Sequence, residues 1–251
     1  MHIAISNSIT SSSQMNGAAA SGGGGGFEST YSMEFDGIDG YITCGNFNSL
    51  AGVNTFSVSF WAKFNTVALN DTLLNHYSTL GFRADAQNNK MTFRWSSSDS
   101  TTVLVQSTNT ITTGTWKHYA CTYDNTDFKL YENGSLISTT NEPSKTYRSI
   151  LNQNLLMGKY WFGLQRLFDG LMDELSIFNY ALTPSEITSI YNSGSPNNLD
   201  DLTTSPSLWF RMGEEATWDG SKWTLTGQGS DTYTAESSNM IEADKKTDVP
   251  S

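Results

Sequence analysis

Charged residues are scarce in this sequence, and basic residues are the scarcer kind. Charged side chains make up 16% of the 251 residues, and 25 acidic against 14 basic ones give a formal net charge of −11. Binding to a phosphate backbone needs a patch of lysine and arginine, and none is visible along the chain, so nucleic-acid partners are disfavoured. The acidic excess is compatible with solubility and with binding of divalent cations.

Cysteines, long apolar runs and a secretion leader are also lacking. Cys44 and Cys121 are too few for a disulfide scaffold and stand in strand-like runs, so we expect buried free thiols unless their strands are neighbours. No apolar stretch is long enough to span a membrane, and residues 1–10 lack the basic start and apolar run of a cleaved leader. We therefore expect no membrane contact and no ordinary secretion; release as part of an assembled particle would need no leader.

Aromatic residues and turn signals are plentiful. The 13 Phe, 11 Tyr and 7 Trp can supply a packed core. Short apolar–polar alternations predict strands, as in residues 55–64, where Phe56, Val58, Phe60 and Ala62 point one way. Asn133-Gly134 is a strong two-residue hairpin signal. The pattern predicts an all-β fold, an antiparallel β-sandwich of jelly-roll type with one short helix and extended terminal arms.

The one well-marked helix starts with a capping box. Thr183 is the expected N-cap, Pro184 the first helical residue and Glu186 the reciprocal partner. Its apolar face would be Ile187, Ile190 and Tyr191, and Gly194 would end it.

Three regions follow from the composition. Residues 1–30 form a Gly/Ser-rich N-terminal arm, either a tether that threads between partner subunits or a disordered tail. Residues 31–196 form the jelly-roll domain. Residues 197–251 form a C-terminal extension, which would fold back as an edge strand or small subdomain, begin a second copy, or pair with a neighbouring molecule.

Five segments follow one another along the chain: FDGIDGYI at 35–42, FSVSFWAK at 56–63, WKHYACTYD at 116–124, LYENG at 130–134 and FDGLMDELSIFNYALTPSEI at 168–187. Their order resembles the laminin G-like, concanavalin A-like jelly-roll domain. Gly40 and Ser176 depart from the family pattern, and Gly40 weakens a cation site. More loosely, both ends of the chain resemble structural proteins of tailed phages of marine bacteria.

The resemblance implies a calcium site, and the chain offers two carboxylates for it. Asp36 ends the opening strand and Asp173 lies in the closing strand, and these two strands are commonly neighbours in a jelly roll. Asp39 and Glu174 are weaker candidates. The alternative is that Asp36 only shapes a turn and Asp173 only caps a backbone amide.

Candidate sugar-binding residues are aromatic. Tyr160 and Trp161 stand in a glycine-flanked loop, and Trp95 is the next candidate. The alternative is that these rings belong to the core.

No catalytic set is visible. The E-x-D-x-E motif of enzymes that share this sandwich is absent, and Asp173 and Glu174 are adjacent, which on a regular strand places them on opposite faces. We therefore expect no enzyme.

Two functions remain. The first is a non-enzymatic virion structural protein, a capsid or tail decoration on the virion surface. It would contact other virion proteins through the N-terminal arm and the C-terminal tail, as a homo-oligomer. The alternative is a carbohydrate-binding module, on a phage or extracellular, that recognises cell-surface glycans.

Overall fold

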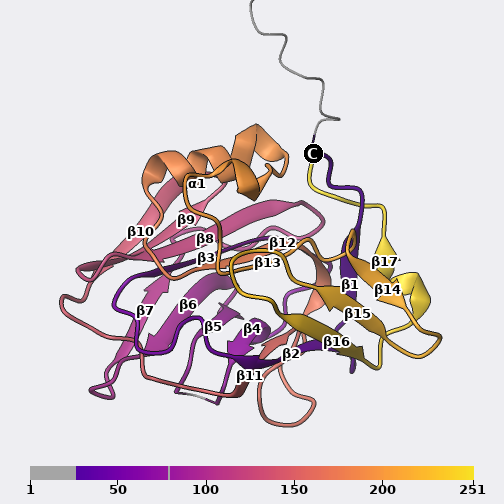
Figure 1. The fold of residues 1–251 in the computed structure, drawn as a ribbon, viewed down its shortest axis with the longest axis horizontal. Coiled ribbons are helices and arrows are strands. Elements are labelled where there is room, and N and C mark those ends of the chain that lie inside the picture. Colours follow the sequence, from indigo (N-terminus) through magenta and orange to yellow (C-terminus); the bar gives the residue numbers. More distant parts are fainter. Residues whose placement is uncertain (1–26, 79) are drawn as a thin grey trace, which may run out of the picture.

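The computed structural model describes residues 27–78 and 80–251, which form two antiparallel sheets packed face to face (Figure 1). The first, sheet A, contains β1 (Ser32–Asp36), β3 (Phe56–Phe64), β8 (Lys117–Tyr123), β9 (Asp127–Glu132), β10 (Ser135–Asn141), β12 (Asp169–Phe178), β13 (Leu208–Phe210) and β17 (Lys245–Lys246). The second, sheet B, contains β2 (Tyr41–Phe47), β4 (Asp71–His76), β5 (Arg83–Gln87), β6 (Lys90–Ser96), β7 (Thr102–Gln106), β11 (Gln153–Met157), β14 (Ala216–Trp218), β15 (Trp223–Thr226) and β16 (Thr234–Ser238).

The strand order shows how the sandwich closes. Sheet A runs β10-β9-β8-β3-β12-β1-β17, with β13 also beside β12, and sheet B runs β14-β15-β16-β2-β11-β4-β5-β6-β7. The opening strand β1 pairs with β12, as the jelly-roll expectation requires. The predicted antiparallel sandwich with one short α-helix is confirmed, whereas residues 1–26 of the predicted arm lie outside the described residues.

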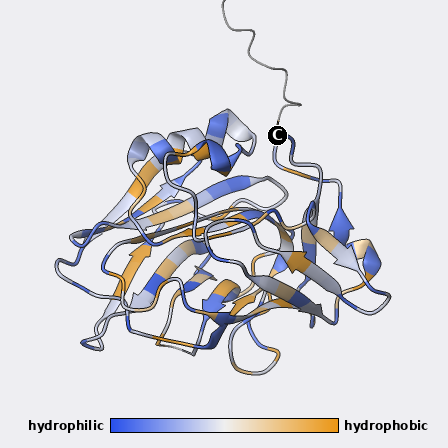
Figure 2. Cartoon of the chain, viewed as in Figure 1, coloured by the Kyte–Doolittle hydropathy of each residue, from blue (hydrophilic) through white to orange (hydrophobic). Residues whose placement is uncertain are grey.

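Side-chain alternation places the main core between the sheets. Phe56, Val58, Phe60 and Ala62 of β3 are all buried there, as predicted. Figure 2 shows apolar and polar residues alternating along many of the strands. Cys44 lies in sheet B and Cys121 in sheet A, and both are buried free thiols.

The C-terminal extension is part of both sheets. β13 pairs with β12, β17 pairs with β1, and β14 to β16 lengthen sheet B beyond β2. The extension therefore folds back on its own sandwich.

A second, smaller core lies on the outer side of sheet A, under α1 (Pro184–Tyr191). The capping box is present: Thr183 Oγ1 accepts from the Glu186 amide at 3.2 Å, and the Thr183 amide donates to the Glu186 carboxylate at 2.7 Å. The helix ends at Tyr191, and its C-cap Asn192 is left-handed, two residues before Gly194, where the sequence predicted the end. Three short 3₁₀ segments complete the elements: η1 (Asn192–Gly194), η2 (Leu199–Asp201) and η3 (Glu242–Asp244). Within residues 27–78 and 80–251, no helix combines the length and apolar character needed to cross a membrane.

Candidate functional site

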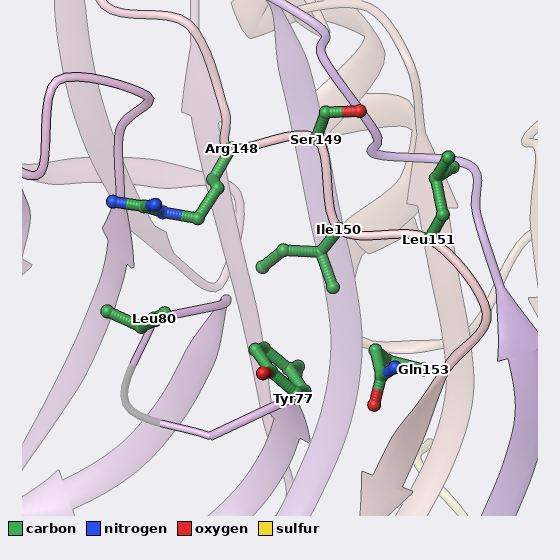
Figure 3. A pocket seen from close by; sticks show the side chains of 7 residues that line it. All are labelled: Tyr77, Leu80, Arg148, Ser149, Ile150, Leu151 and Gln153. Atoms are coloured by element: carbon green, nitrogen blue, oxygen red, sulfur yellow. The ribbon is translucent and has the colours of Figure 1, made fainter.

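A groove formed by two adjoining hollows lies at one end of sheet B. The hollows share Tyr77 and Gln153 and measure about 280 and 190 Å³. The larger is lined by Tyr77, Leu80, Arg148, Ser149, Ile150, Leu151 and Gln153, and the smaller by Tyr77, Ser78, Gln153, Asn154, Leu156 and Trp161. Figure 3 shows Tyr77, Leu80 and Ile150 close together in the larger hollow, with Arg148 and Gln153 on either side. We call the two hollows together the Tyr77–Trp161 groove.

The loop after β4 positions Tyr77. Its backbone is left-handed, with φ of 53°, which turns the side chain out of the strand and leaves it 38% exposed. Asn75 Nδ2 donates to the carbonyl oxygens of Tyr77 and Ser78 at 3.5 and 3.3 Å. A side chain at Gly81 would place Cβ 1.7 Å from the His76 carbonyl oxygen, so the loop closes this tightly only with glycine there.

The loop of residues 158–168 positions Trp161. It starts at Gly158, whose φ is +86° and where a Cβ would lie 2.3 Å from the ring of Phe35. The Tyr160 amide donates to the Gln165 carbonyl at 3.3 Å, which narrows the loop. Trp161 is 43% exposed and lines the smaller hollow, and its indole lies 6.0 Å from the Tyr160 ring. Of the three aromatic candidates, Trp161 is the one that the structure places in the groove.

Trp95 does not lie in this site. Its side chain points between the sheets, is 1% exposed, and packs on Phe56, Tyr123 and Tyr147. It cannot serve as an exposed platform, which corrects that expectation. Tyr77, Gln153 and Asn154 were not singled out from the sequence, because only the folding of distant segments brings them together.

A cluster of three arginines and one aspartate lies on the outer face of sheet B. Arg83 Nε donates to both carboxylate oxygens of Asp85, at 2.9 and 3.1 Å, and a terminal nitrogen of Arg94 lies 3.2 Å from Asp85. The Arg83 and Arg166 guanidinium groups lie 5.2 and 4.6 Å from the centre of the Tyr160 ring. Burial raises the pKa of Asp85, against the pull of the nearby arginines.

The strand register connects this arginine cluster with the groove. Leu156 of β11 is opposite Asn75 of β4, Asn75 is opposite Arg83 of β5, and Arg83 is opposite Arg94 of β6. Directly paired residues share a face of the sheet, so these four side chains form one row across the outer face. Leu156 lines the smaller hollow of the groove.

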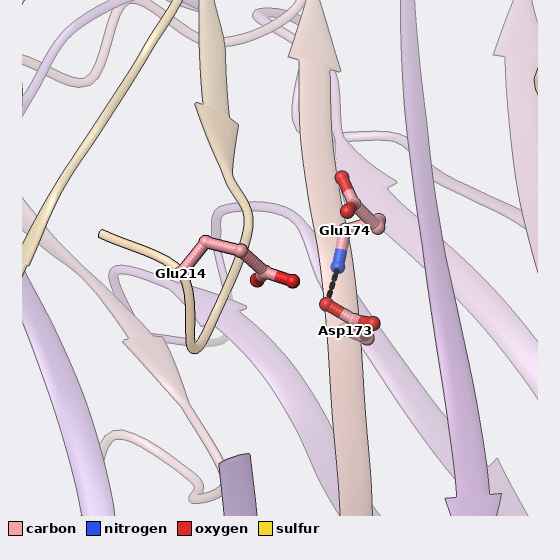
Figure 4. A group of neighbouring side chains, drawn as sticks. All are labelled: Asp173, Glu174 and Glu214. Atoms are coloured by element: carbon pink, nitrogen blue, oxygen red, sulfur yellow. Dashed lines mark hydrogen bonds between the residues drawn. The ribbon is translucent and has the colours of Figure 1, made fainter. Parts of the chain in front are cut away.

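A second charged cluster lies on the outer side of sheet A and contains Asp173. A β-bulge in β12 between Asp173 and Ser176 gives Glu174 a left-handed backbone, with φ of 50°. One carboxylate oxygen each from Asp173, Glu174 and Glu214 lie within 4.8 Å of one another, and Glu214 approaches from the loop after β13 (Figure 4). The expectation that Asp173 and Glu174 face opposite sides is therefore wrong, because the bulge breaks the alternation.

This acidic cluster is covered and hydrogen-bonded. Ser29 donates to Asp173 at 2.6 Å, Trp209 Nε1 donates to Glu174 at 2.5 Å, and Arg211 Nε lies 3.4 Å from Glu174. The Thr30 and Tyr31 amides donate to one oxygen of Glu214. Burial raises the pKa of Glu174 to about 7, and burial together with the charge of Glu174 raises the pKa of Asp173.

Asp36 and Asp173 are not brought to one site. The register pairs Asp36 with Asp169, four residues along β12 from Asp173, which is roughly 13 Å at the rise of a strand. Oδ1 of Asp36 accepts from the amides of Ile38, Asp39 and Gly40, as the turn-forming alternative requires. Around Asp173, Arg211 and neutral donors already contact the carboxylates that a cation would need. These residues do not fit a calcium ion shared by Asp36 and Asp173.

Residues 36–188 match the family model of the concanavalin A-like lectin/glucanases superfamily. No curated protein matches the sequence.

Among solved structures, a protein of Bacteroides ovatus named for carbohydrate binding superposes with a TM-score of 0.68 at 15% identity. The match covers 89% of this chain and only 62% of that protein. Domain 4 of the extracellular arabinanase AbnA of Geobacillus stearothermophilus, in complex with arabinotriose, has a TM-score of 0.50 and 26% identity over 64% of this chain and 76% of its own. The CBM40 of the Ruminococcus gnavus IT-sialidase, bound to α2,3-sialyllactose, has a TM-score of 0.51 and 14% identity over 66% of this chain and all of its own.

Proposed function

Because the chain belongs to the concanavalin A-like lectin/glucanase superfamily, whose model spans residues 36–188, we propose that it binds carbohydrate in the Tyr77–Trp161 groove. One observation carries the proposal: two exposed aromatic side chains line a groove whose other walls present amide groups. A sugar ring has an apolar face that stacks on an aromatic ring and a rim of hydroxyl groups that need hydrogen-bond partners.

The chemistry of the lining fits both requirements. Trp161 and Tyr77 supply apolar surface, and Leu80 and Leu151 extend it. Gln153 and Asn154 each offer a carbonyl acceptor and an amino donor to hydroxyl groups. The groove is shallow and open, so an internal segment of a long polysaccharide can lie in it.

The comparisons support this proposal. Arabinotriose is present in the Geobacillus domain and sialyllactose in the Ruminococcus domain, so related sandwiches hold oligosaccharides of different composition. We propose binding without turnover for the present chain, because the acidic cluster that contains Asp173 and Glu174 is covered and lies on the other sheet.

The first test is the replacement Trp161→Ala, with Phe162→Ala as the matched control. Phe162 is in the same loop, is 58% exposed, and lines neither hollow. Loss of an aromatic anchor should lower affinity for a polysaccharide found on a glycan array by about tenfold or more, which corresponds to about 1.4 kcal/mol. Phe162→Ala should change affinity less than about threefold.

The measurement is isothermal titration with a thermal melt of each variant. Equal losses of affinity in both variants would show that the sugar does not bind in the groove. Failure of the wild-type protein to bind any polysaccharide on the array would overturn the proposed function.

A place on a virion surface stays a second proposal, and one geometrical feature favours it. Residues 27–29 and 249–251 line one hollow on the outer side of sheet A, whereas the groove lies on sheet B. Attachment through this end of the molecule, alone or in a homo-oligomer, would leave the groove facing outward. Mass spectrometry of density-purified particles, against cell-free supernatant, tests it: a fixed ratio to a capsid or tail protein supports attachment, and presence only in the supernatant contradicts it.

A further inference from the structure

The arginine cluster on sheet B has more positive charge than its partners neutralise. Arg83, Arg94 and Arg166 all interact electrostatically with one carboxylate, that of Asp85. The cluster therefore carries a formal excess of two positive charges in a chain whose net charge is −11. Arginine cannot lose its proton in a protein, so this excess persists at every physiological pH.

Several donors of the cluster have no acceptor among the described residues. Among these residues Arg83 donates hydrogen bonds through Nε, and the Arg166 guanidinium lies over the face of Tyr160 and interacts electrostatically with Asp85. Arg94 donates to Gln87 and lies against Asp85, but its Nε is buried without a partner. A guanidinium group presents its terminal N–H groups in a fork that matches a carboxylate or a sulfate group.

The cluster adjoins the groove. Asn75, between Leu156 and Arg83 in the row across sheet B, is fully buried and its Oδ1 has no hydrogen-bond partner. Tyr160, which Arg83 and Arg166 contact, is the chain neighbour of Trp161 in the groove. Arg94 and Arg166 are half-buried and Arg83 is buried, so a polysaccharide stacked on Trp161 would bring its next residues toward Arg94 and Arg166.

We propose that Arg83, Arg94 and Arg166 form an anionic subsite beside the groove, so that the ligand is an acidic polysaccharide with carboxylate or sulfate groups. This inference rests on the proposed function, since it assumes that the groove binds sugar. Neutral donors would suffice for a neutral glycan, and the excess charge would then oppose folding without a ligand to offset it.

The test compares charged polymers with their neutral counterparts. Polygalacturonate is set against carboxyl-reduced polygalacturonate, and dextran sulfate against dextran, by isothermal titration at low and high NaCl. We expect the charged member of at least one pair to bind about tenfold tighter, which corresponds to about 1.4 kcal/mol. That preference should shrink as salt rises. The pair that shows it identifies carboxylate or sulfate as the recognised group.

Variants assign the preference to the cluster. Arg166→Gln should abolish most of it, Arg166→Lys should retain part of it, and Lys90→Gln should leave it unchanged. Replacing Lys90 by Gln removes the same charge from the same sheet. Lys90 stands at the start of β6 and outside the row. Thermal melts show whether each variant is folded.

The outcomes separate the two proposals. Equal binding of charged and neutral polymers, lost in Trp161→Ala, overturns the anionic subsite and leaves the groove. Equal effects of Arg166→Gln and Lys90→Gln also overturn the subsite, because general charge attraction would explain them. Absence of binding to every polymer tested, on the array and here, overturns both.

Discussion

The two outer faces of the sandwich carry clusters of opposite charge in the same ratio. On sheet B, Arg83, Arg94 and Arg166 interact with Asp85. On sheet A, Asp173, Glu174 and Glu214 lie together, and Arg211 pairs with Glu174 and Glu214. Each cluster has three like charges and one counter-charge when all groups are ionised. Both clusters are largely buried, with Asp85 at 0% and Arg83 at 8% exposure against 0% for Asp173 and 5% for Glu174, but only the basic cluster lies beside an open groove.

The difference follows from how carboxyl and guanidinium groups respond to burial. A buried carboxyl group can bind a proton, and burial favours that form, as the raised pKa of Asp173 and Glu174 indicates. An arginine cannot become neutral in this way, because it keeps its proton. The acidic cluster can therefore be covered and still approach neutrality, while the basic cluster needs solvent or an anion.

Covering the acidic cluster also joins distant parts of the chain. Ser29 precedes β1, Asp173 and Glu174 lie in β12, and Trp209 and Arg211 belong to the C-terminal extension. Arg211 further donates to the Glu28 carbonyl at 2.5 Å and lies 4.3 Å from the centre of the Phe27 ring. This cluster is a structural junction, and the arginine cluster is a candidate for binding.

Removing the counter-charge of the basic cluster should have the largest effect on stability. Asp85→Ala leaves Arg83 and Arg94 without their carboxylate, and breaking a buried ion pair in this way lowers the free energy of unfolding by about 3–5 kcal/mol. Chemical denaturation at neutral pH measures it. A loss below about 1 kcal/mol would mean that water already stabilises these arginines, in which case a ligand would gain little by replacing it.

The fold could be predicted from the sequence because its signals are local. Alternation in residues 55–64, the Asn133-Gly134 turn and the Thr183 capping box each need only neighbouring residues, and all three are present in the structure. The fold-back of residues 197–251 was only one of several alternatives, since strand pairing between distant segments leaves no local pattern.

The candidate site was much less predictable. Trp161 could be selected as a loop aromatic between glycines, but Trp95 has the same chemical character and lies in the core. Arg83, Arg94 and Arg166 are too far apart in sequence to suggest a basic patch, and only strand register and the return of the 158–168 loop unite them. The bulge at Glu174 had a local signal that the alternation argument passed over: Asp173 and Glu174 are two successive polar residues between Met172 and Leu175, which both lie in the core.

Removing the counter-charge of the acidic cluster should have a smaller, pH-dependent effect. Arg211→Met keeps the length of the side chain and removes the cation beside Glu174 and Glu214. At pH 8 we expect a loss of about 3 kcal/mol in the free energy of unfolding. At pH 5 the loss should be smaller, because a protonated Glu174 no longer needs the cation. Denaturation at both pH values tests this, and equal losses would contradict a role for charge.

The replacement Glu174→Gln should have the smallest effect and is the sharpest test of the acidic cluster. Burial raises the folded-state pKa of Glu174 to about 7, above its ordinary value of 4.5, so the folded protein binds a proton more tightly than the unfolded chain. The stability from this group is full below about pH 4.5 and is lost as pH rises through 7. Glutamine does not titrate, so the difference between variant and wild type should move by about 2 kcal/mol in the variant's favour from pH 5 to pH 8.

The two buried histidines do not affect the difference in stability between variant and wild type. Burial lowers the pKa of His76 to about 4 and of His118 to about 3, so both make the protein less stable as pH falls below their ordinary value of 6.5. His76 lies in sheet B, whereas Trp61 separates His118 from Asp173 in one row across sheet A. Both histidines are the same in wild type and variant, so their contribution cancels in the difference. Asp173, Glu214 and Arg211 face Glu174, and because the charge of Glu174 raises the pKa of Asp173, the measured difference reports these two carboxyl groups together. A pH-independent difference would show that Glu174 is ionised throughout, and the acidic cluster would then hold its excess charge as the arginine cluster does.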